Sequence, residues 1–316
     1  MWLLSSSRAE LHFFPSPESV PGGYAILSHV WGPDEQSFQS IQALRKSCAK
    51  SGGNPRDHVS DKIRECCKLA EKRGYDWVWV DTCCIDKTSS TELSEAINSM
   101  FRYYSLAKVC YAFLADVPTG TDMIALSSED SAFRRSRWHK RGWTLQELLA
   151  PPELLFVSER WEMLGSKADL SDVLQQVTRV PADVLLNREE FINTSVAQRM
   201  SWAAGRVTTR LEDEAYCLMG IFRVNMPTLY GEGRQAFRRL QQEIMRHYAD
   251  TSLFAWGNAP PEALTDLMRL YRFPSRDRST GHVLPERDAL WSTLADCIIL
   301  LGLQVDCQAS GKYFVP

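Results

Sequence analysis

Residues 75–80 read Tyr75-Asp-Trp-Val-Trp-Val80 and are followed by Asp81. Apolar side chains occupy both odd and even positions, so a strand here would be buried on both faces, as in a parallel sheet. A helix is expected before it, over 60–73, because Ser60 suits an N-cap and Gly74 follows the last turn. A second helix is expected after it, over 89–104, since its first four residues fit a capping box. The segment therefore predicts a buried strand between two helices.

Three further apolar runs, 24–30, 108–114 and 153–157, predict buried strands of the same kind. Strands that alternate with helices predict a parallel sheet covered by helices on both faces, which is an α/β fold. The remaining stretches predict a hairpin over 1–14, a helix over 37–50, a loop over 51–55, a polar loop over 118–135, and helices over 170–177, 196–204, 211–221 and 235–248.

This pattern divides the chain into three parts. Residues 1–165 form the α/β domain, 166–257 a helical region packed on it, and 258–316 a segment with no assigned structure. The chain stops within Gly311-Lys-Tyr-Phe-Val-Pro316, which resembles an interrupted strand, so we expect it to be a piece of a longer protein.

Composition excludes several classes of protein. The 316 residues carry a net charge of −3, which argues against a nucleic-acid binder. The nine cysteines include no C-x-x-C pair and the six histidines are scattered, so no metal site is expected. Buried free thiols suit a reducing compartment, and no run approaches the length of a membrane span, so we expect a cytoplasmic protein without one.

Polar side chains lie where the predicted strands end. Ser28 and His29 close the first strand, Asp81 follows the second, and Asp116 follows the third. Ligands of parallel sheets bind at the carboxyl ends of the strands. Glu147 follows the loop after the third strand, so we group it with these side chains.

The segment Ser136-Arg-Trp-His-Lys-Arg-Gly-Trp143-Thr-Leu-Gln-Glu147 supplies the strongest site candidate. Trp143 and Glu147 are four residues apart and share one face of a helix. A carboxylate beside an indole and near cations is a plausible binding or catalytic group. The alternative is structural, because Thr144-x-x-Glu147 also fits a capping box. Spacing favours the capping interpretation.

Other motifs also carry two interpretations. The loop from Asp81 to Asp86 either holds ligand hydroxyls or is a turn stabilised by its carboxylates. Cys83 or Cys84 would be a nucleophile with His29 as base, or simply a buried thiol. Trp31 would stack on a ligand ring or seal the core, and the single glycine beside it, Gly32, does not make a dinucleotide fingerprint.

Charged residues of the helical region are interpreted as structural. Arg206, Arg210 and Asp213 are typical of an ion-pair network between helices. The segment Tyr230-Gly-Glu-Gly233 predicts a turn, since two glycines are too few for a phosphate loop.

Four ordered blocks resemble those of the fungal heterokaryon incompatibility (HET) domain. They are Tyr24-Ala-Ile-Leu-Ser-His-Val-Trp-Gly32, Trp77-Val-Trp-Val-Asp-Thr-Cys-Cys-Ile-Asp86, Glu92-Leu-Ser-Glu-Ala-Ile-Asn-Ser-Met100 and Arg141-Gly-Trp-Thr-Leu-Gln-Glu-Leu148. Residues 200–220 and 230–233 resemble the helical region that follows this domain in vegetative incompatibility proteins. The resemblance covers roughly 1–257, and four blocks in order are more specific than any single motif.

The HET domain is in turn similar to Toll/interleukin-1 receptor (TIR) domains, which implies a flavodoxin-like sheet. Residues 24–34 resemble the first TIR strand and loop, and the segment ending in Trp143-Thr-Leu-Gln-Glu147-Leu resembles the helix that carries the catalytic glutamate of TIR enzymes that cleave NAD⁺. Thr144 replaces the cysteine of that pattern, a departure that leaves the carboxylate untouched.

The resemblance implies a site and an activity. Glu147 and Asp81 would be catalytic, and the substrate-binding residues would be Ser28, His29, Trp31, Gly32, Cys84, Asp86, Arg141 and Trp143. NAD⁺ would be a substrate, hydrolysed to nicotinamide and ADP-ribose in a cell-death response to non-self fusion, with no separate cofactor. Homo-oligomers on activation and partner incompatibility proteins are also implied. The alternative is a non-enzymatic adaptor that acts through homotypic assembly.

Overall fold

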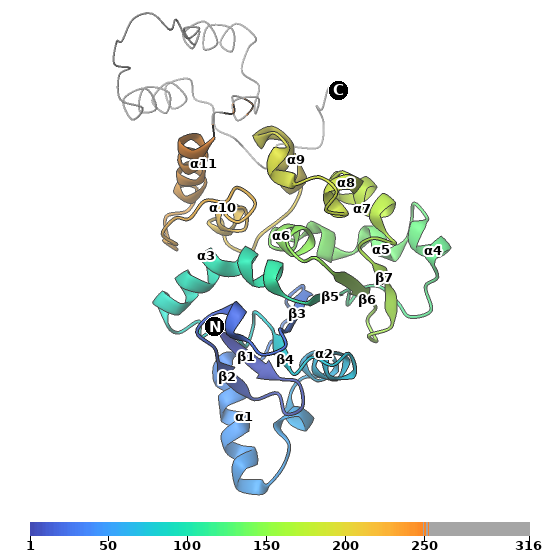
Figure 1. The fold of residues 1–316 in the computed structure, drawn as a ribbon, viewed down its shortest axis with the longest axis vertical. Helices are drawn as coiled ribbons and strands as arrows, with labels where there is room; N and C mark the ends of the chain where they lie inside the picture. Colours follow the sequence, from blue (N-terminus) through green and yellow to red (C-terminus); the bar gives the residue numbers. More distant parts are fainter. Residues whose placement is uncertain (249, 251, 253–316) are drawn as a thin grey trace, which may run out of the picture.

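The computed structural model describes residues 1–248, 250 and 252. Its centre is one seven-stranded sheet in the order β2-β1-β4-β3-β5-β6-β7 (Figure 1). The strands are β1 (Trp2–Ser5), β2 (Leu11–Phe13), β3 (Ala25–His29), β4 (Trp77–Trp79), β5 (Val109–Phe113), β6 (Leu154–Val157) and β7 (Met163–Ser166). The predicted α/β fold is therefore confirmed, and the predicted hairpin is β1–β2.

The four central strands are parallel, and the strands beyond them are antiparallel. β3 pairs with β4 on one side and with β5 on the other, and β5 pairs with β6, all in parallel. β1 and β7 run antiparallel to their neighbours, and β7 was not predicted. Numbered along the chain, the parallel strands have the order 2-1-3-4, the flavodoxin-like arrangement, whose switch point lies between β3 and β5.

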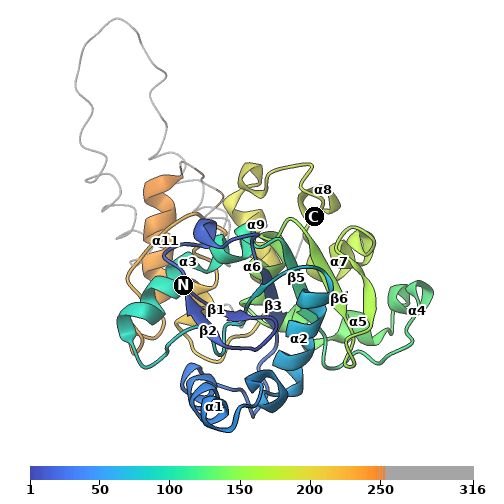
Figure 2. The same ribbon diagram turned by 60° about the horizontal axis from the view of Figure 1, so that its bottom comes forward.

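Helices cover both faces of the sheet. Figures 1 and 2 show α2 (Asp61–Lys72) and α3 (Ser90–Leu106) on opposite sides of it. The predicted inner face of α2, which includes Ile63 and Ala70, is buried. The hydroxyl of Ser89 accepts a hydrogen bond from Glu92 N, so the predicted start of α3 is also confirmed. α1 (Phe38–Ser51) packs beside the hairpin.

Two predictions of local structure are wrong. Residues 118–135 contain two short helices, α4 (Met123–Ser127) and α5 (Ala132–Arg135), because Asp122 and Ser131 cap their first turns. Within 211–221 only α10 (Asp213–Tyr216) is helical, and the rest is turns around it.

The helical region lies against the sheet domain on the α3 side (Figure 1). Its other helices are α7 (Ser171–Thr178), α8 (Ala182–Leu185), α9 (Val196–Ala203) and α11 (Gln235–His247). A Cβ added to Gly220 would overlap Cβ of Phe101 on α3, so the two parts are in direct contact. Residues 258–316, left without assigned structure, lie outside the described residues.

The described part of the chain contains neither a candidate membrane span nor a candidate metal cluster. None of its helices is long and apolar enough to cross a membrane. None of its clusters of His, Cys, Asp and Glu could hold a metal ion. Seven of the cysteines lie in this part, and all seven are buried and unbridged.

Candidate functional site

Glu147 lies on α6 (Thr144–Leu149), a helix whose residues are all buried. Its carboxyl oxygen Oε2 accepts a hydrogen bond from the hydroxyl of Ser28, near the carboxyl end of β3. The same hydroxyl accepts from the indole Nε1 of Trp138, at 2.7 Å. The side chains of Ser28, Trp138 and Glu147 are all buried, and Glu147 is 4% exposed. The carboxyl is therefore fixed beside β3, at the switch point of the sheet.

The capping interpretation of Glu147 is wrong. The N-cap of α6 is Trp143, which has helical dihedrals and no capping side chain. The hydroxyl of Thr144 donates to backbone carbonyls, with Arg141 O at 2.9 Å, and Glu147 reaches across to β3 instead of back to the cap. The other end of α6 is capped by the buried Lys167, whose Nζ donates to Leu148 O at 3.2 Å and to Pro151 O at 2.8 Å. Hydrogen bonds therefore fix both ends of α6, which helps to keep the Glu147 carboxyl in one position.

The environment of Glu147 favours its neutral form. Burial and the nearby charge of Asp81 raise its pKa to about 8, against the hydrogen bond from Ser28 and the charges of Arg141 and Arg206. A carboxyl with a pKa above neutrality is typical of catalytic and binding sites. Tyr104 on α3 and Cys110 on β5 are close enough to be affected: burial raises the pKa of each, and the charge of Glu147 raises it further.

Trp31 and Asp81 lie together after β3 and β4. The indole Nε1 of Trp31 donates to Asp81 Oδ2 at 2.7 Å. Lys87 Nζ lies 3.9 Å from the centroid of the Trp31 ring, and Cζ of Arg141 lies 5.1 Å from it. The ring is 42% exposed, so Trp31 does not seal the core. The Trp31 ring is a partly exposed aromatic surface at the strand ends, and Lys87 and Arg141 make cation–π contacts with it.

His29 is buried between two carboxylates. Its Nε2 lies 3.6 Å from Glu35 Oε2 and 3.8 Å from Asp81 Oδ1, distances longer than hydrogen bonds. Glu35 accepts hydrogen bonds from Gly32 N, at 2.7 Å, and from Lys62 Nζ. Burial opposes ionisation of Glu35, but His29, Lys62 and the Gly32 amide outweigh it and lower its pKa to about 2. Glu35 is therefore a fixed negative charge beside His29.

Some buried polar atoms in this part of the molecule have no hydrogen-bond partner within the described protein. They include both ring nitrogens of His29, Oδ1 of Asp81, Nε2 of Gln146 and Nη2 of Arg206. Leaving such an atom unpaired costs about 1–3 kcal/mol. Asp81 and Arg206 are charged neighbours of Glu147, so their unpaired atoms offer polar contacts to a ligand bound beside this carboxyl.

The structure brings together Ser28, His29, Trp31, Asp81, Arg141 and Glu147, with Gly32 one step away through Glu35. The other predicted site residues have structural contacts. Cys84 lies in the turn after β4, and its Sγ accepts from Val80 N at 3.4 Å. Asp86 accepts from Thr88 N at 3.0 Å and from Gln39 Nε2 at 2.7 Å. The indole of Trp143 contacts Asp213.

Sequence reasoning missed Trp138, Glu35 and Lys62, and took Arg206 for a member of an ion-pair network. Trp138 stands in the quoted segment and Glu35 lies three residues after Gly32, so both were within reach. Nothing in the sequence spacing links Lys62 or Arg206 to the strand ends.

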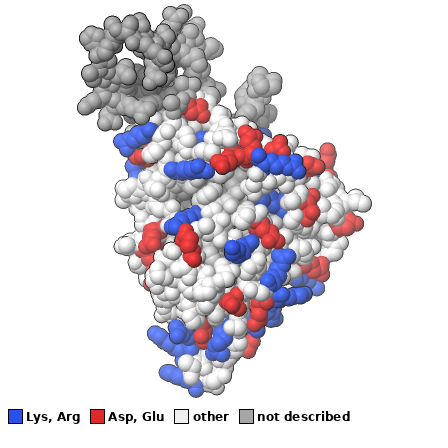
Figure 3. All heavy atoms as spheres, in the orientation of Figure 1, with Lys and Arg blue, Asp and Glu red and all other residues white. Residues whose placement is uncertain are grey.

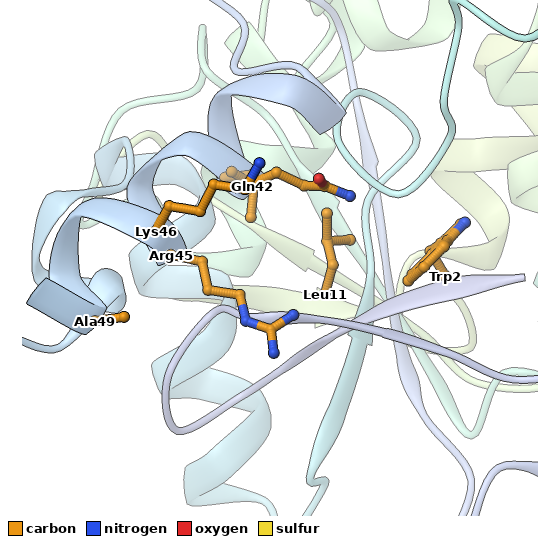
Figure 4. A pocket seen from close by; sticks show the side chains of 7 residues that line it. Trp2, Leu11, Gln42, Arg45, Lys46 and Ala49 are labelled. Atoms are coloured by element: carbon orange, nitrogen blue, oxygen red, sulfur yellow. The ribbon is translucent and has the colours of Figure 1, made fainter.

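A separate pocket of 230 Å³ lies between the hairpin and α1, apart from Glu147 (Figure 4). Trp2, Leu11 and Ile41 form its apolar wall, and Arg45 and Lys46 stand on α1 beside it. Figure 3 shows charges of both signs interspersed on the face drawn, with basic side chains gathered at the lower end, where α1 lies in Figure 1.

Fold and site define an α/β protein with a buried carboxyl at the switch point of a flavodoxin-ordered sheet. Residues 24–128, which contain three of the four quoted blocks, match the family model "Heterokaryon incompatibility protein (HET)", and the chain therefore carries the predicted HET domain. The match ends before α6 and Glu147. Residues 235–284 match a second family, "Domain of unknown function (DUF8212)", most of which lies outside the described residues.

The chain is 45% identical over 234 residues to the vegetative incompatibility protein HET-E-1 of Podospora anserina. This alignment covers 73% of the chain but 16% of that relative, so the chain spans a small part of its length. No solved structure matches the chain.

Proposed function

We propose that the chain is the effector part of a fungal incompatibility protein and hydrolyses NAD⁺ to nicotinamide and ADP-ribose in a cell-death response. The observation that supports this most is the buried Glu147 carboxyl, held by Ser28 at the switch point with the charges of Asp81, Arg141 and Arg206 nearby. The HET domain and the incompatibility relative support the cell-death role.

In this proposal the bond between the nicotinamide nitrogen and the ribose carbon breaks, and water supplies the new oxygen on that carbon. Positive charge develops on the ribose as the bond breaks, and ionised Glu147 stabilises it. The electron pair of the broken bond leaves with nicotinamide, and the water loses one proton. Trp31 offers a ring surface to a nucleotide base, and Arg141 a cation to its phosphates.

The raised pKa of Glu147 has a consequence for this activity. With a pKa of about 8, only a minority of molecules carry the ionised carboxylate at neutral pH. A positively charged nicotinamide ring bound beside it would favour ionisation. Substrate binding would thus produce the charged form that the reaction needs.

The test is nicotinamide release from NAD⁺ by purified protein, with products separated to tell linear from cyclic ADP-ribose. We expect E147Q to lose activity by about a hundredfold or more. E153Q is the matched control, because it makes the same substitution at Glu153, whose half-exposed side chain pairs with Arg73. Wild-type activity in E147Q would sink the mechanism.

A second candidate function is a non-enzymatic adaptor that acts through homotypic assembly. Its supporting observation is that Glu147 is 4% exposed, so the carboxyl is closed off in a single chain. Protein that stays without NAD⁺ hydrolysis when forced to oligomerise, yet still kills cells, would favour the adaptor. Hydrolysis that begins on oligomerisation would favour the enzyme and a site completed by assembly.

A further inference from the structure

Arg206 of the helical region contacts the start of α6, the helix that carries Glu147. Its Nη1 donates to the hydroxyl of Thr144, the first residue of α6, at 3.0 Å, and to Arg141 O at 3.0 Å. Its Nε donates to Trp202 O at 3.1 Å, at the end of α9. One planar guanidinium therefore joins α9 to the start of α6, a geometry that needs its fixed fork of donors.

The backbone next to Arg206 joins the same two segments. Val207 N donates to Lys140 O at 2.7 Å, and Gly142 N donates to Val207 O at 2.8 Å, which makes a short parallel bridge. A Cβ on Gly142 would lie 2.5 Å from Cγ2 of Thr208, so the segments are in close contact. The turn that leads into α6 is thus fixed by residues far along the chain.

A second contact comes from α10. Asp213 accepts a hydrogen bond from the hydroxyl of Tyr230 at 2.9 Å, and its carboxyl is also contacted by the indole of Trp143, the N-cap of α6. Burial raises the pKa of Asp213, against these hydrogen bonds and the nearby arginines. The first turn of α6 is therefore held by two residues of the helical region.

Arg206 also acts on Glu147 by charge. Its remaining nitrogen, Nη2, is buried and has no partner within the described protein. The charged groups near Glu147 are Asp81 after β4, Arg141 before α6, and Arg206, with Tyr104 and Cys110 as neutral neighbours. Arg206 and Arg141 favour the ionised carboxylate and Asp81 opposes it.

We propose that Arg206 is a positioning residue of the Glu147 site, which fixes the start of α6 against β3 and keeps a positive charge beside the carboxyl. The helical region is then part of the site rather than a neighbour of it. The positioning role stands on geometry alone, whereas an effect on NAD⁺ hydrolysis rests on the function proposed above.

Amide hydrogen exchange, measured on the full chain, tests the positioning role. R206Q removes the charge and most of the fork, and R206K keeps the charge but cannot span three acceptors. R199Q is the matched control, because Arg199 is a buried arginine of α9 that donates to Ile221 O at 3.1 Å and makes no hydrogen bond to α6 within the described residues. Unfolding temperature is measured for all three variants.

We expect amides of residues 141–150 to exchange roughly tenfold faster or more in R206Q and R206K, a change equivalent to about 1.4 kcal/mol. R199Q should leave that segment protected and loosen residues near its own contacts. Equal exchange of 141–150 in wild type and both Arg206 variants would overturn the proposal. So would the same loss of protection in R199Q, because it would show general destabilisation.

Nicotinamide release gives a second readout. R206Q should shift the rise of activity to higher pH, because Glu147 loses a charge that favours ionisation, whereas R206K should lower the rate and keep the pH dependence. If the wild type releases no nicotinamide but the exchange results hold, the proposed function fails and the positioning role stands. If R206Q is active and its rate of nicotinamide release has the same pH dependence as that of the wild type, the proposed effect of the Arg206 charge on Glu147 is refuted.

Discussion

Replacing Glu147 by Gln should make the protein more stable at alkaline pH, even though it removes the proposed catalytic group. Gln keeps the shape of the carboxyl and an oxygen that accepts from Ser28, but it cannot ionise. The carboxyl of Glu147 is 4% exposed, so its charged form is desolvated in the folded state and solvated in the unfolded state. At alkaline pH the folded wild type therefore has the free-energy cost of a desolvated carboxylate, and the variant does not.

The magnitude follows from the pKa of the folded state. Glu147 titrates at about 8 when folded, against 4.5 for an exposed glutamic acid, a gap of about 3.5. Each pKa unit is worth about 1.36 kcal/mol, so the wild type should lose about 4–5 kcal/mol relative to E147Q as pH rises from 4.5 through 8. The sign is fixed because the folded state binds the extra proton in this window, so stability falls as pH rises.

Urea unfolding of both proteins at pH 5, 6, 7, 8 and 9 measures the difference in unfolding free energy. Other groups titrate in this range, including Lys167, whose pKa burial lowers to about 8. They are present in both proteins, so their contributions cancel in the difference. E153Q, with its half-exposed side chain, should show a difference close to zero at every pH.

A difference between wild type and E147Q that does not change from pH 5 to 9 would refute the reasoning, because it would mean that Glu147 ionises as freely in the folded chain as in water. A difference that grows in the opposite direction would mean that the folded state favours the carboxylate. In the expected case, one variant is more stable and less active, as is common for active-site residues.

Two further substitutions test burial and packing. Burial and the charge of Arg206 lower the pKa of His139 to about 3, so neutral His139 favours folding fully above pH 6.5 and loses this contribution as pH falls toward 3. H139F should therefore flatten the decline of unfolding temperature between pH 6.5 and 3. An equal slope in both proteins would contradict this. G142A would place its Cβ 2.5 Å from Thr208 Cγ2 and should cost about 1–3 kcal/mol in urea unfolding, whereas G53A, with no contact under 3.5 Å, should cost far less.

The fold was predictable from sequence wherever an element is long and its burial pattern simple. The apolar runs around Ile26, Val78 and Tyr111 predicted the central strands, because strands buried on both faces contain few polar residues. β7 was missed since Met163-Leu-Gly-Ser166 is short and mixed, and its strand conformation depends on pairing with β6. The short helices α4 and α5 were missed because capping residues were interpreted as loop composition.

The site was predictable in part. Ser28 and Asp81 followed from the rule that ligands bind at strand ends, whereas Glu147 was a candidate from its segment and received its catalytic role from a family resemblance. Local spacing gave Glu147 the wrong role, because a capping box and a carboxyl turned toward the sheet share one sequence pattern. Arg206 lies 59 positions beyond Glu147, and its contact depends on how α9 packs, which no local pattern encodes.

The antiparallel strands that flank the parallel core determine how copies of this chain could associate. The outermost strands, β2 and β7, have only three and four residues, and β7 pairs with β6 through a register shift. Short, irregular outer strands are poor templates for strand addition between molecules. Within the described residues the sheet edges therefore disfavour extension from one copy to the next, and any association between copies is expected to involve helices and loops.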